Sequence, residues 1–383
     1  MVLVRWLMLA VLSAITVASC GGSDAGAPKK VPAPQSAADP AVARKLQEVL
    51  DVQRDGYGAT GMAAAVVIRG RLFWSGGSGL ANRQTKAPVT ADTTFPIFSI
   101  TKMFVGALAV KLAQEGRLRL DDPLSGSLAD WPNADRITLR TLLNHTSGVG
   151  GDLRSGARLE RAIDARPRSI WTPQKTLGYA RRPQGAPGER WEYSNANYLL
   201  AGLVIEKATG RTVAEMLRKS ILDPLRLRDA VLQPQERPRG APAHGYGGPP
   251  RVARALRIGG RYTPYPSEAS AGWTAGGMVA SAPSVARFAD SLLRGDLLSP
   301  DSRTQLLRFL PAGAGYDGYG LGVGKGQGPT GEELWGHLGA GPGFVTSVTH
   351  MPAKAITVAV FSSGGGDIGS IAGMLTNAAL GPG

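Results

Sequence analysis

The stretch FPIFSITKMFVGALAVKLAQEGRL, residues 95–118, constrains the fold more than any other part of the chain. Residues 103–110 are apolar nearly all the way round a helix, whereas a surface helix has a single apolar stripe. Such a helix must be covered on every side. With 383 residues, 43% hydrophobic and 19% charged, the chain has the composition of a globular protein that can bury it.

Lys102 stands at the start of this helix, which we expect to run from Ser99 to Glu115 and to end at Gly116. Its stem could lie along the core while the ammonium reaches water. Alternatively, burial lowers its pKa and makes it a base. Ser99 lies three residues earlier on the same helical face, so hydroxyl and amine can meet. The N–H of Ser99, at the helix start, would face developing negative charge.

The N-terminal segment MVLVRWLMLAVLSAITVASCGG has one arginine, a short apolar run and then small residues. The run is too short to span a membrane comfortably, so residues 1–19 are predicted to be an export signal. The VASC ending resembles a bacterial lipobox, although Val17 replaces the preferred leucine. This resemblance implies that Cys20 is lipidated, so that the mature protein is a lipoprotein anchored on the periplasmic side of the cell envelope.

Residues 20–40 are small, polar and rich in proline, which predicts a flexible tether. Cys20 is the only cysteine, so no disulfide is expected. The net charge is +14, with arginines clustered in 154–182 and 251–261. These clusters form either a solvated basic face or a contact with anionic lipid or cell-wall polymers. Neither a nucleic-acid partner nor a metal or other cofactor is expected, since no binding module and no ligand spacing occurs.

The rest of the chain predicts strands at both ends and helices between them. MAAAVVIRG and RLFWSGG predict a hairpin that turns at Gly70–Arg71, and YGLGVGKG, FVTSVTHM and AITVAVFSS predict later strands, the last two joined at Pro352–Ala353. Helices are predicted over 41–54, 196–208, 212–217, 284–293, after Ser299–Pro300 and over 368–379. We therefore expect an α/β (α+β) fold in which the first hairpin joins the last strands in one antiparallel sheet flanked by helices.

Two further motifs could assist Ser99. Tyr193-Ser194-Asn195 precedes a helix; the tyrosine could relay a proton and the asparagine could hold a substrate amide, or the segment is a simple helix cap. His337-Leu338-Gly339-Ala340 lies next to a predicted strand. There Gly339 would let a substrate approach the backbone, and the Ala340 N–H could complete an oxyanion hole with that of Ser99, unless these residues simply form a turn.

Together, S-x-x-K, Y-x-N and H-x-G resemble the signature of the serine β-lactamase and penicillin-binding protein superfamily, especially the branch with class C β-lactamases, D,D-carboxypeptidases and family VIII esterases. TLLNHTSGVG, SAGWTAGGMVASAPSVARFADSLL and GHLGAGPGFVTSVTHMP extend the resemblance over the chain from residue 41. It implies a single domain over 41–383, with the sheet in about 41–118 and 271–383 and a helical insertion in about 119–270. His145 and Ser147 then look structural.

The resemblance also implies roles for the motif residues. Ser99 forms an acyl-enzyme, and Lys102 and Tyr193 share the proton transfers. Asn195 holds the acyl side of the substrate, and His337 orients Tyr193 and incoming polar groups. The expected partner is a small ester, amide or peptide.

One residue departs from the family pattern. Leu338 stands where the family has a threonine or serine that helps to bind a carboxylate, which favours esterase-type activity over β-lactamase or D,D-carboxypeptidase activity. A non-catalytic envelope-binding lipoprotein is the alternative of another class. A conventional α/β-hydrolase is disfavoured because the chain has no G-x-S-x-G elbow.

Overall fold

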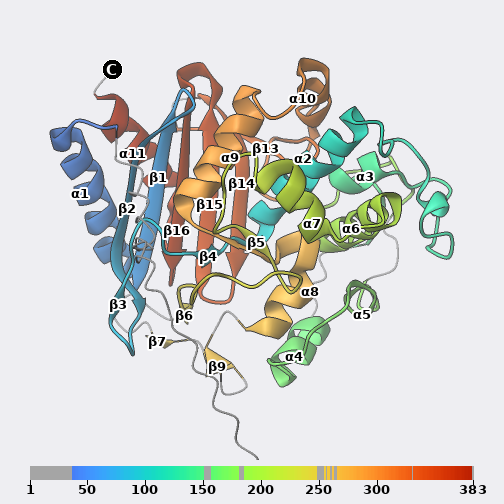
Figure 1. The fold of residues 1–383 in the computed structure, drawn as a ribbon, viewed down its shortest axis with the longest axis horizontal. Coiled ribbons are helices and arrows are strands. Elements are labelled where there is room, and N and C mark those ends of the chain that lie inside the picture. Colours follow the sequence, from blue (N-terminus) through green and yellow to red (C-terminus); the bar gives the residue numbers. More distant parts are fainter. Residues whose placement is uncertain are drawn as a thin grey trace, which may run out of the picture. The chain divides into compact units, whose positions relative to one another are not determined.

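The computed structural model describes residues 37–150, 157–180, 185–247, 254–255, 257–258, 261–262, 265–329 and 331–381. A nine-stranded antiparallel sheet runs in the order β11-β12-β13-β14-β15-β16-β1-β2-β3 (Figure 1). Its strands are β1 Gly61–Ile68, β2 Arg71–Asn82, β3 Ala87–Pro88, β11 Leu310–Pro311, β12 Gly318–Tyr319, β13 Gly324–Gln327, β14 Glu333–Gly341, β15 Phe344–Met351 and β16 Ile356–Ser363. β1 pairs with β16 over its whole length, so the predicted union of the first hairpin with the last strands is confirmed.

Helices cover both faces of this sheet because side chains along its central strands alternate between them. Met62 and Ala64 of β1 pack with α1 (Pro40–Tyr57) and α11 (Ile368–Leu380). Ala63 and Ala65, on the opposite face, belong to the larger core, against which α9 (Ala282–Arg294) packs. The flanking helices predicted from the sequence are therefore present on both sides.

The middle of the chain supplies most of the other helices and several short strands. The helices are α3 Leu139–Leu143, α4 Ala157–Ala165, α5 Pro173–Leu177, α6 Asn195–Thr209, α7 Val213–Leu217, a π-helical turn Arg218–Leu222 and α8 Pro266–Gly276, followed later by α10 Pro300–Leu306. A three-stranded sheet joins β4 Phe95–Pro96, β10 Met278–Ala280 and β5 Val231–Leu232, and two small hairpins pair β6 Tyr246–Gly247 with β7 Arg254–Ala255 and β8 Arg257–Ile258 with β9 Arg261–Tyr262.

The structure corrects two strand predictions. The first hairpin turns at Arg69–Gly70 rather than Gly70–Arg71, since both of these residues have positive φ, 49° and 83°. YGLGVGKG is not one strand, because the chain reverses between β12 and β13 at Gly322, whose φ is 92°. A Cβ at Gly322 would lie 2.6 Å from the Lys102 carbonyl oxygen, so this turn rests directly on the central helix.

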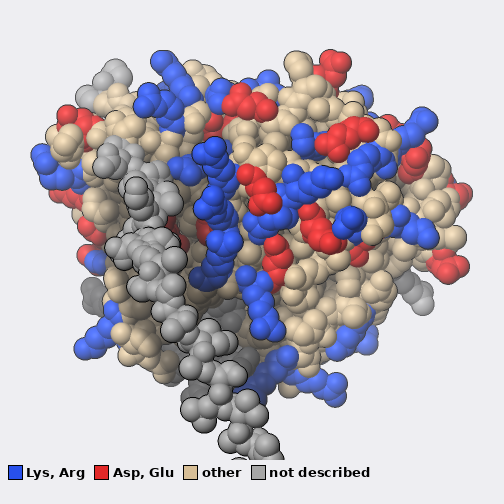
Figure 2. All heavy atoms as spheres, in the orientation of Figure 1, with Lys and Arg blue, Asp and Glu red and all other residues tan. Residues whose placement is uncertain are grey.

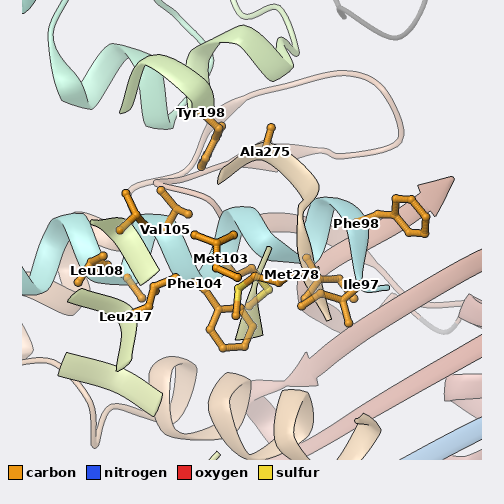
Figure 3. Close-up of a cluster of buried hydrophobic side chains, with 14 of the residues drawn as sticks. Ile97, Phe98, Met103, Phe104, Val105, Leu108, Tyr198, Leu217, Ala275 and Met278 are labelled. Atoms are coloured by element: carbon orange, nitrogen blue, oxygen red, sulfur yellow. The ribbon is translucent and has the colours of Figure 1, made fainter. Parts of the chain in front are cut away.

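That central helix, α2 (Thr101–Gln114), is buried nearly all round, as predicted. Figure 3 shows Tyr198 and Ala275 on one side of it and Leu217 and Met278 on the other. Its predicted start is wrong by two residues. Ser99 belongs instead to η1 (Phe98–Ile100), a 3₁₀ turn in which the Ile100 N–H donates to the Ile97 carbonyl at 3.1 Å.

The predicted signal and lipidated Cys20 lie outside the described residues, as does most of the predicted tether. None of the described helices combines the length and apolarity required to cross a bilayer. Figure 2 shows Lys and Arg side chains spread over one face among acidic ones. The two arginine-rich segments fall partly outside the described residues.

We predict that Gly106→Ala in α2 destabilises the fold, because its Cβ would lie 2.1 Å from the backbone oxygen of Leu321. Relieving this overlap costs about 1–3 kcal/mol of unfolding free energy. Gly373→Ala in α11 is the matched control, since nothing lies within 4 Å of its Cβ position; it should be neutral or stabilise by up to about 1 kcal/mol. Denaturant unfolding measures both, and equal effects would contradict the predicted close approach.

Candidate active site

Ser99 is placed by a strained backbone between β4 and α2. Phe98, directly before it, has φ of 44°, a conformation that is costly for a bulky residue. The Phe98 side chain is buried and its ring lies 6.1 Å from that of Phe344. A Cβ at Gly341 of β14 would fall 1.9 Å from this ring, so a glycine is needed there to admit it. Packing against β14 and β15 therefore holds the turn that carries Ser99.

Lys102 is fully buried, with 0% of its surface exposed, so the alternative in which its charge reaches water is wrong. Its Nζ lies 3.1 Å from Ser99 Oγ, 2.7 Å from Asn195 Oδ1 and 2.7 Å from the carbonyl oxygen of Ala275. The last two oxygens can only accept hydrogen bonds. A neutral amine would donate its two N–H groups to the oxygens of Asn195 and Ala275, so that its lone pair would face the Ser99 hydroxyl. This geometry suits a base for Ser99.

Tyr193 is directed at the same hydroxyl rather than merely packing before a helix. Its O–H donates to Ser99 Oγ at 2.9 Å, and the Lys102 Nζ lies 4.9 Å from the centre of its ring. Ser194 is the N-cap of α6, but its side chain makes no capping hydrogen bond. The structure thus brings Ser99, Lys102, Tyr193 and Asn195 into one cluster from three separate elements.

His145 holds the segment that carries Tyr193. Its carbonyl accepts from the Glu192 N–H at 2.9 Å, its Nδ1 accepts from the Ser194 N–H at 3.2 Å, and its ring lies 4.5 Å from that of Tyr193. Burial lowers its pKa well below the usual value, so the ring is neutral. Ser147, also buried, donates to Asn197 Oδ1 at 2.6 Å. These contacts fit the structural roles expected for His145 and Ser147.

His337 lies inside strand β14, not beside it. Its Nδ1 is 2.6 Å from the Leu338 carbonyl oxygen and its Nε2 is 2.8 Å from the Tyr319 hydroxyl; because a carbonyl only accepts, Nδ1 carries the proton. Burial, together with the charge that Lys102 carries when protonated, lowers the pKa of His337 to about 3. Both ring nitrogens thus have partners other than Tyr193, whose ring centre is 6.4 Å away. These contacts hold the His337 ring within β14. Because His337 also lines the cavity, its predicted role toward Tyr193 and incoming polar groups stays a prediction.

Gly339 allows β14 to approach the turn that carries Ser99. A Cβ there would lie 2.4 Å from the Ile97 carbonyl oxygen and 2.3 Å from Thr346 Oγ1. The β13–β14 pairing ends at Gly336, so the following residues of β14 run past η1 without pairing with β13. Ala340 and Ser99 line the same cavity. The two residues predicted to supply the oxyanion hole are therefore adjacent to one space.

This cavity has a volume of about 290 Å³ and lies in front of Ser99. Tyr193, Asn195, His337 and Leu338 also line it, and Leu338 is 48% exposed. Sequence reasoning missed other lining or supporting residues: Ala275, whose backbone oxygen holds Lys102, Tyr316, Tyr319 and Glu268. Ala275 lies in the segment SAGWTAGGMVASAPSVARFADSLL, but its role could not be assigned from the sequence because it acts through its backbone. The two tyrosines act through His337.

Within the described residues, no group of three or more His, Cys, Asp or Glu side chains could hold a metal ion. The groups that the structure brings together around the cavity are a hydroxyl, an amine, a phenol and backbone N–H groups. Such a set can carry out acyl transfer by covalent catalysis.

Comparisons with known proteins agree with this chemistry. The sequence is 26% identical over 289 residues to the putative penicillin-binding protein PbpX of Bacillus subtilis (strain 168), covering 76% of this chain but only 66% of that protein. It is 29% identical over 317 residues to esterase EstB of Burkholderia gladioli, covering 74% of this chain and 79% of EstB.

A solved structure of D-amino acid amidase from Ochrobactrum anthropi SV3, complexed with L-phenylalanine, superposes with a TM-score of 0.76 at 26% identity. The match covers 88% of this chain and 98% of the amidase. The sequence model of the family described as Beta-lactamase matches residues 42–381. The chain therefore belongs to the beta-lactamase family and is a serine hydrolase of the β-lactamase/transpeptidase fold.

Proposed function

We propose that the protein hydrolyses uncharged esters and amides through an acyl-enzyme on Ser99. The observation that carries this is the convergence of Lys102 Nζ and the Tyr193 hydroxyl on Ser99 Oγ, at 3.1 and 2.9 Å. Both groups are within hydrogen-bond reach of the proton that must leave.

In the first step, Ser99 Oγ bonds to the substrate carbonyl carbon while its proton passes to Lys102. We assign Lys102 as this base because it is buried behind Ser99, whereas Tyr193 lines the cavity. Tyr193 then gives its proton to the departing alcohol or amine and regains one from Lys102. The backbone N–H groups of Ser99 and Ala340 stabilise the oxyanion.

Water next attacks the acyl carbon, and the bond from that carbon to Ser99 Oγ breaks. The proton lost by the water passes through Tyr193 and Lys102 to Ser99 Oγ, which restores the hydroxyl and releases the acid. Asn195 has a further role in this scheme, since its Oδ1 accepts from Lys102 and orients the amine. We therefore place Asn195 with the proton-transfer groups as well as on the acyl side of the substrate.

The choice of substrate rests on Leu338, which lies in the cavity wall and has no hydroxyl. A β-lactam or a peptide C-terminus carries a carboxylate that would lack this hydrogen bond. The names of two similar proteins, an esterase and a D-amino acid amidase, support ester or amide cleavage. A D,D-carboxypeptidase or β-lactamase remains the second candidate, supported by the similarity to a putative penicillin-binding protein.

We further propose that the protein is exported and anchored through a lipid on Cys20, since residues 17–20 resemble a lipobox. Cells that express the protein should incorporate a labelled fatty acid into it, and Cys20→Ala should abolish the incorporation. Equal incorporation by the variant would contradict the proposal.

We predict that a fluorophosphonate probe labels the purified protein and that Ser99→Ala abolishes labelling, because the hydroxyl next to the Lys102 amine is then lost. Ser147→Ala, which removes the other serine considered, should retain labelling. Labelled peptides located by mass spectrometry provide the measurement. Persistent labelling of Ser99→Ala would refute the nucleophile, and an unlabelled wild-type protein would favour a non-catalytic envelope-binding role.

We also predict that p-nitrophenyl acetate is cleaved with a higher kcat/KM than nitrocefin. Leu338→Thr should raise kcat/KM for nitrocefin by roughly tenfold or more, because a hydrogen bond to a charged group contributes about 1.5–3 kcal/mol. Its kcat/KM for the acetate ester should change little. Similar efficiencies of the wild-type enzyme on both substrates would contradict the role given to Leu338.

A further inference from the structure

We propose that the Tyr316 hydroxyl donates a hydrogen bond to an uncharged oxygen in the leaving group of the substrate. This inference rests on the proposed function and adds a substrate class to it: esters or amides whose departing alcohol or amine carries a second carbonyl. None of the three sequence motifs contains Tyr316.

The Tyr316 ring is held in one position in the cavity wall. It lies on the loop between β11 and β12, where the Tyr316 N–H donates to the Gly313 carbonyl at 3.1 Å. The next N–H, that of Asp317, donates to the Lys325 carbonyl at 2.9 Å. A Cβ at Gly324 of β13 would fall 2.2 Å from the ring, so the ring packs directly on this strand. The loop and β13 thus fix the ring before a substrate binds.

Both groups that contact the Tyr316 oxygen are hydrogen-bond donors. The Leu338 N–H donates to it at 3.2 Å, and a backbone N–H can only donate. His337 Nδ1 also lies 3.2 Å from it, and this nitrogen carries the proton because it faces the Leu338 carbonyl. The hydrogen of the Tyr316 hydroxyl therefore has no acceptor among the residues that the structure describes. Because Tyr316 lines the cavity, a substrate there can supply that acceptor.

Tyr316 keeps this hydrogen at the pH of an ordinary assay. A phenol loses its proton only near pH 10, and burial raises the pKa of Tyr316 to about 12. A neutral carbonyl oxygen can only accept a hydrogen bond, so it complements a phenol that can only donate one more. An uncharged acceptor also agrees with the preference for uncharged substrates that the proposed function draws from Leu338.

The Tyr316 hydroxyl and the proposed oxyanion site lie along the same edge of β14. Leu338 and Ala340 are two residues apart on this strand, so their N–H groups project from the same edge. The first N–H contacts Tyr316, and the second is assigned to the oxyanion. Since a strand rises about 3.3 Å per residue, the two positions are about 7 Å apart. The acceptor must therefore lie several bonds away from the carbonyl that Ser99 attacks.

The leaving group is the part of the substrate that can reach Tyr316. In the proposed mechanism, Tyr193 gives its proton to the departing alcohol or amine. Tyr193 and Tyr316 both line the cavity, and their ring centres lie 6.4 and 5.5 Å from that of His337. A leaving group that takes its proton from Tyr193 thus departs near Tyr316, whereas Asn195 is assigned to the acyl side.

The experiment measures kcat/KM for two acetate esters, 4-oxopentyl acetate and 4-methylpent-4-enyl acetate, in which a methylene group replaces the ketone oxygen of the leaving alcohol. We expect the wild-type protein to cleave the ketone ester faster. Tyr316→Phe should lower the ratio of the two kcat/KM values by about two- to tenfold, the range of a neutral hydrogen bond. Tyr319→Phe, the matched control, removes the other hydroxyl that contacts His337 and should keep the wild-type ratio.

A ratio in Tyr316→Phe equal to that of the wild-type protein would overturn this inference, as would an equal fall of the ratio in Tyr319→Phe, which would place the effect in His337. Ser99-dependent cleavage of p-nitrophenyl acetate would still leave the proposed function standing. If no ester is cleaved faster by the wild-type protein than by Ser99→Ala, the proposed function and the inference both fail. Because each ratio is measured within one protein, partial misfolding of a variant does not affect the comparison.

Discussion

The buried amine of Lys102 is the contact on which the rest of the site depends. A lysine without solvent exposure loses its hydration, so protein groups must replace it. Here the replacement comes from η1, α6 and the end of α8, through Ser99, Asn195 and Ala275. The hydrogen bonds of one amine therefore bring together three segments that are far apart in the sequence.

The packing around α2 holds Lys102 in the position from which its amine makes these hydrogen bonds. Because α2 is apolar nearly all round, it is stable only where it is covered on every side. Gly322 lets the turn between β12 and β13 lie directly against the Lys102 carbonyl. On the other side, Gly339 and Gly341 let β14 lie against the turn that carries Ser99. Close backbone approaches at these glycines thus hold α2 and the turn that carries Ser99 in place.

Much of this could be predicted from the sequence. The apolar run around Met103 predicted the buried helix, and the spacing of Ser99 and Lys102 predicted their contact. The turn geometry could not be predicted, since the strain at Phe98 is imposed by packing against β14 and β15. The hydrogen bond from Lys102 to Ala275 could not be predicted either, because a backbone carbonyl leaves no trace in side-chain patterns. His337 was predicted to orient Tyr193 and incoming polar groups; the contacts of its ring nitrogens with the hydroxyls of Tyr316 and Tyr319 could not be predicted, since the three motifs do not include these tyrosines.

The central claim is that Ser99 and Lys102 act as one unit. The most direct measurement is kcat/KM for p-nitrophenyl acetate in Ser99→Ala, Lys102→Met and the double variant. If the amine acts only through the hydroxyl, each single variant should lose on the order of a thousandfold or more and the double variant no more than that, since residues of one unit are not additive. Losses that multiply in the double variant, or a Lys102→Met variant that keeps most of its activity, would contradict the account.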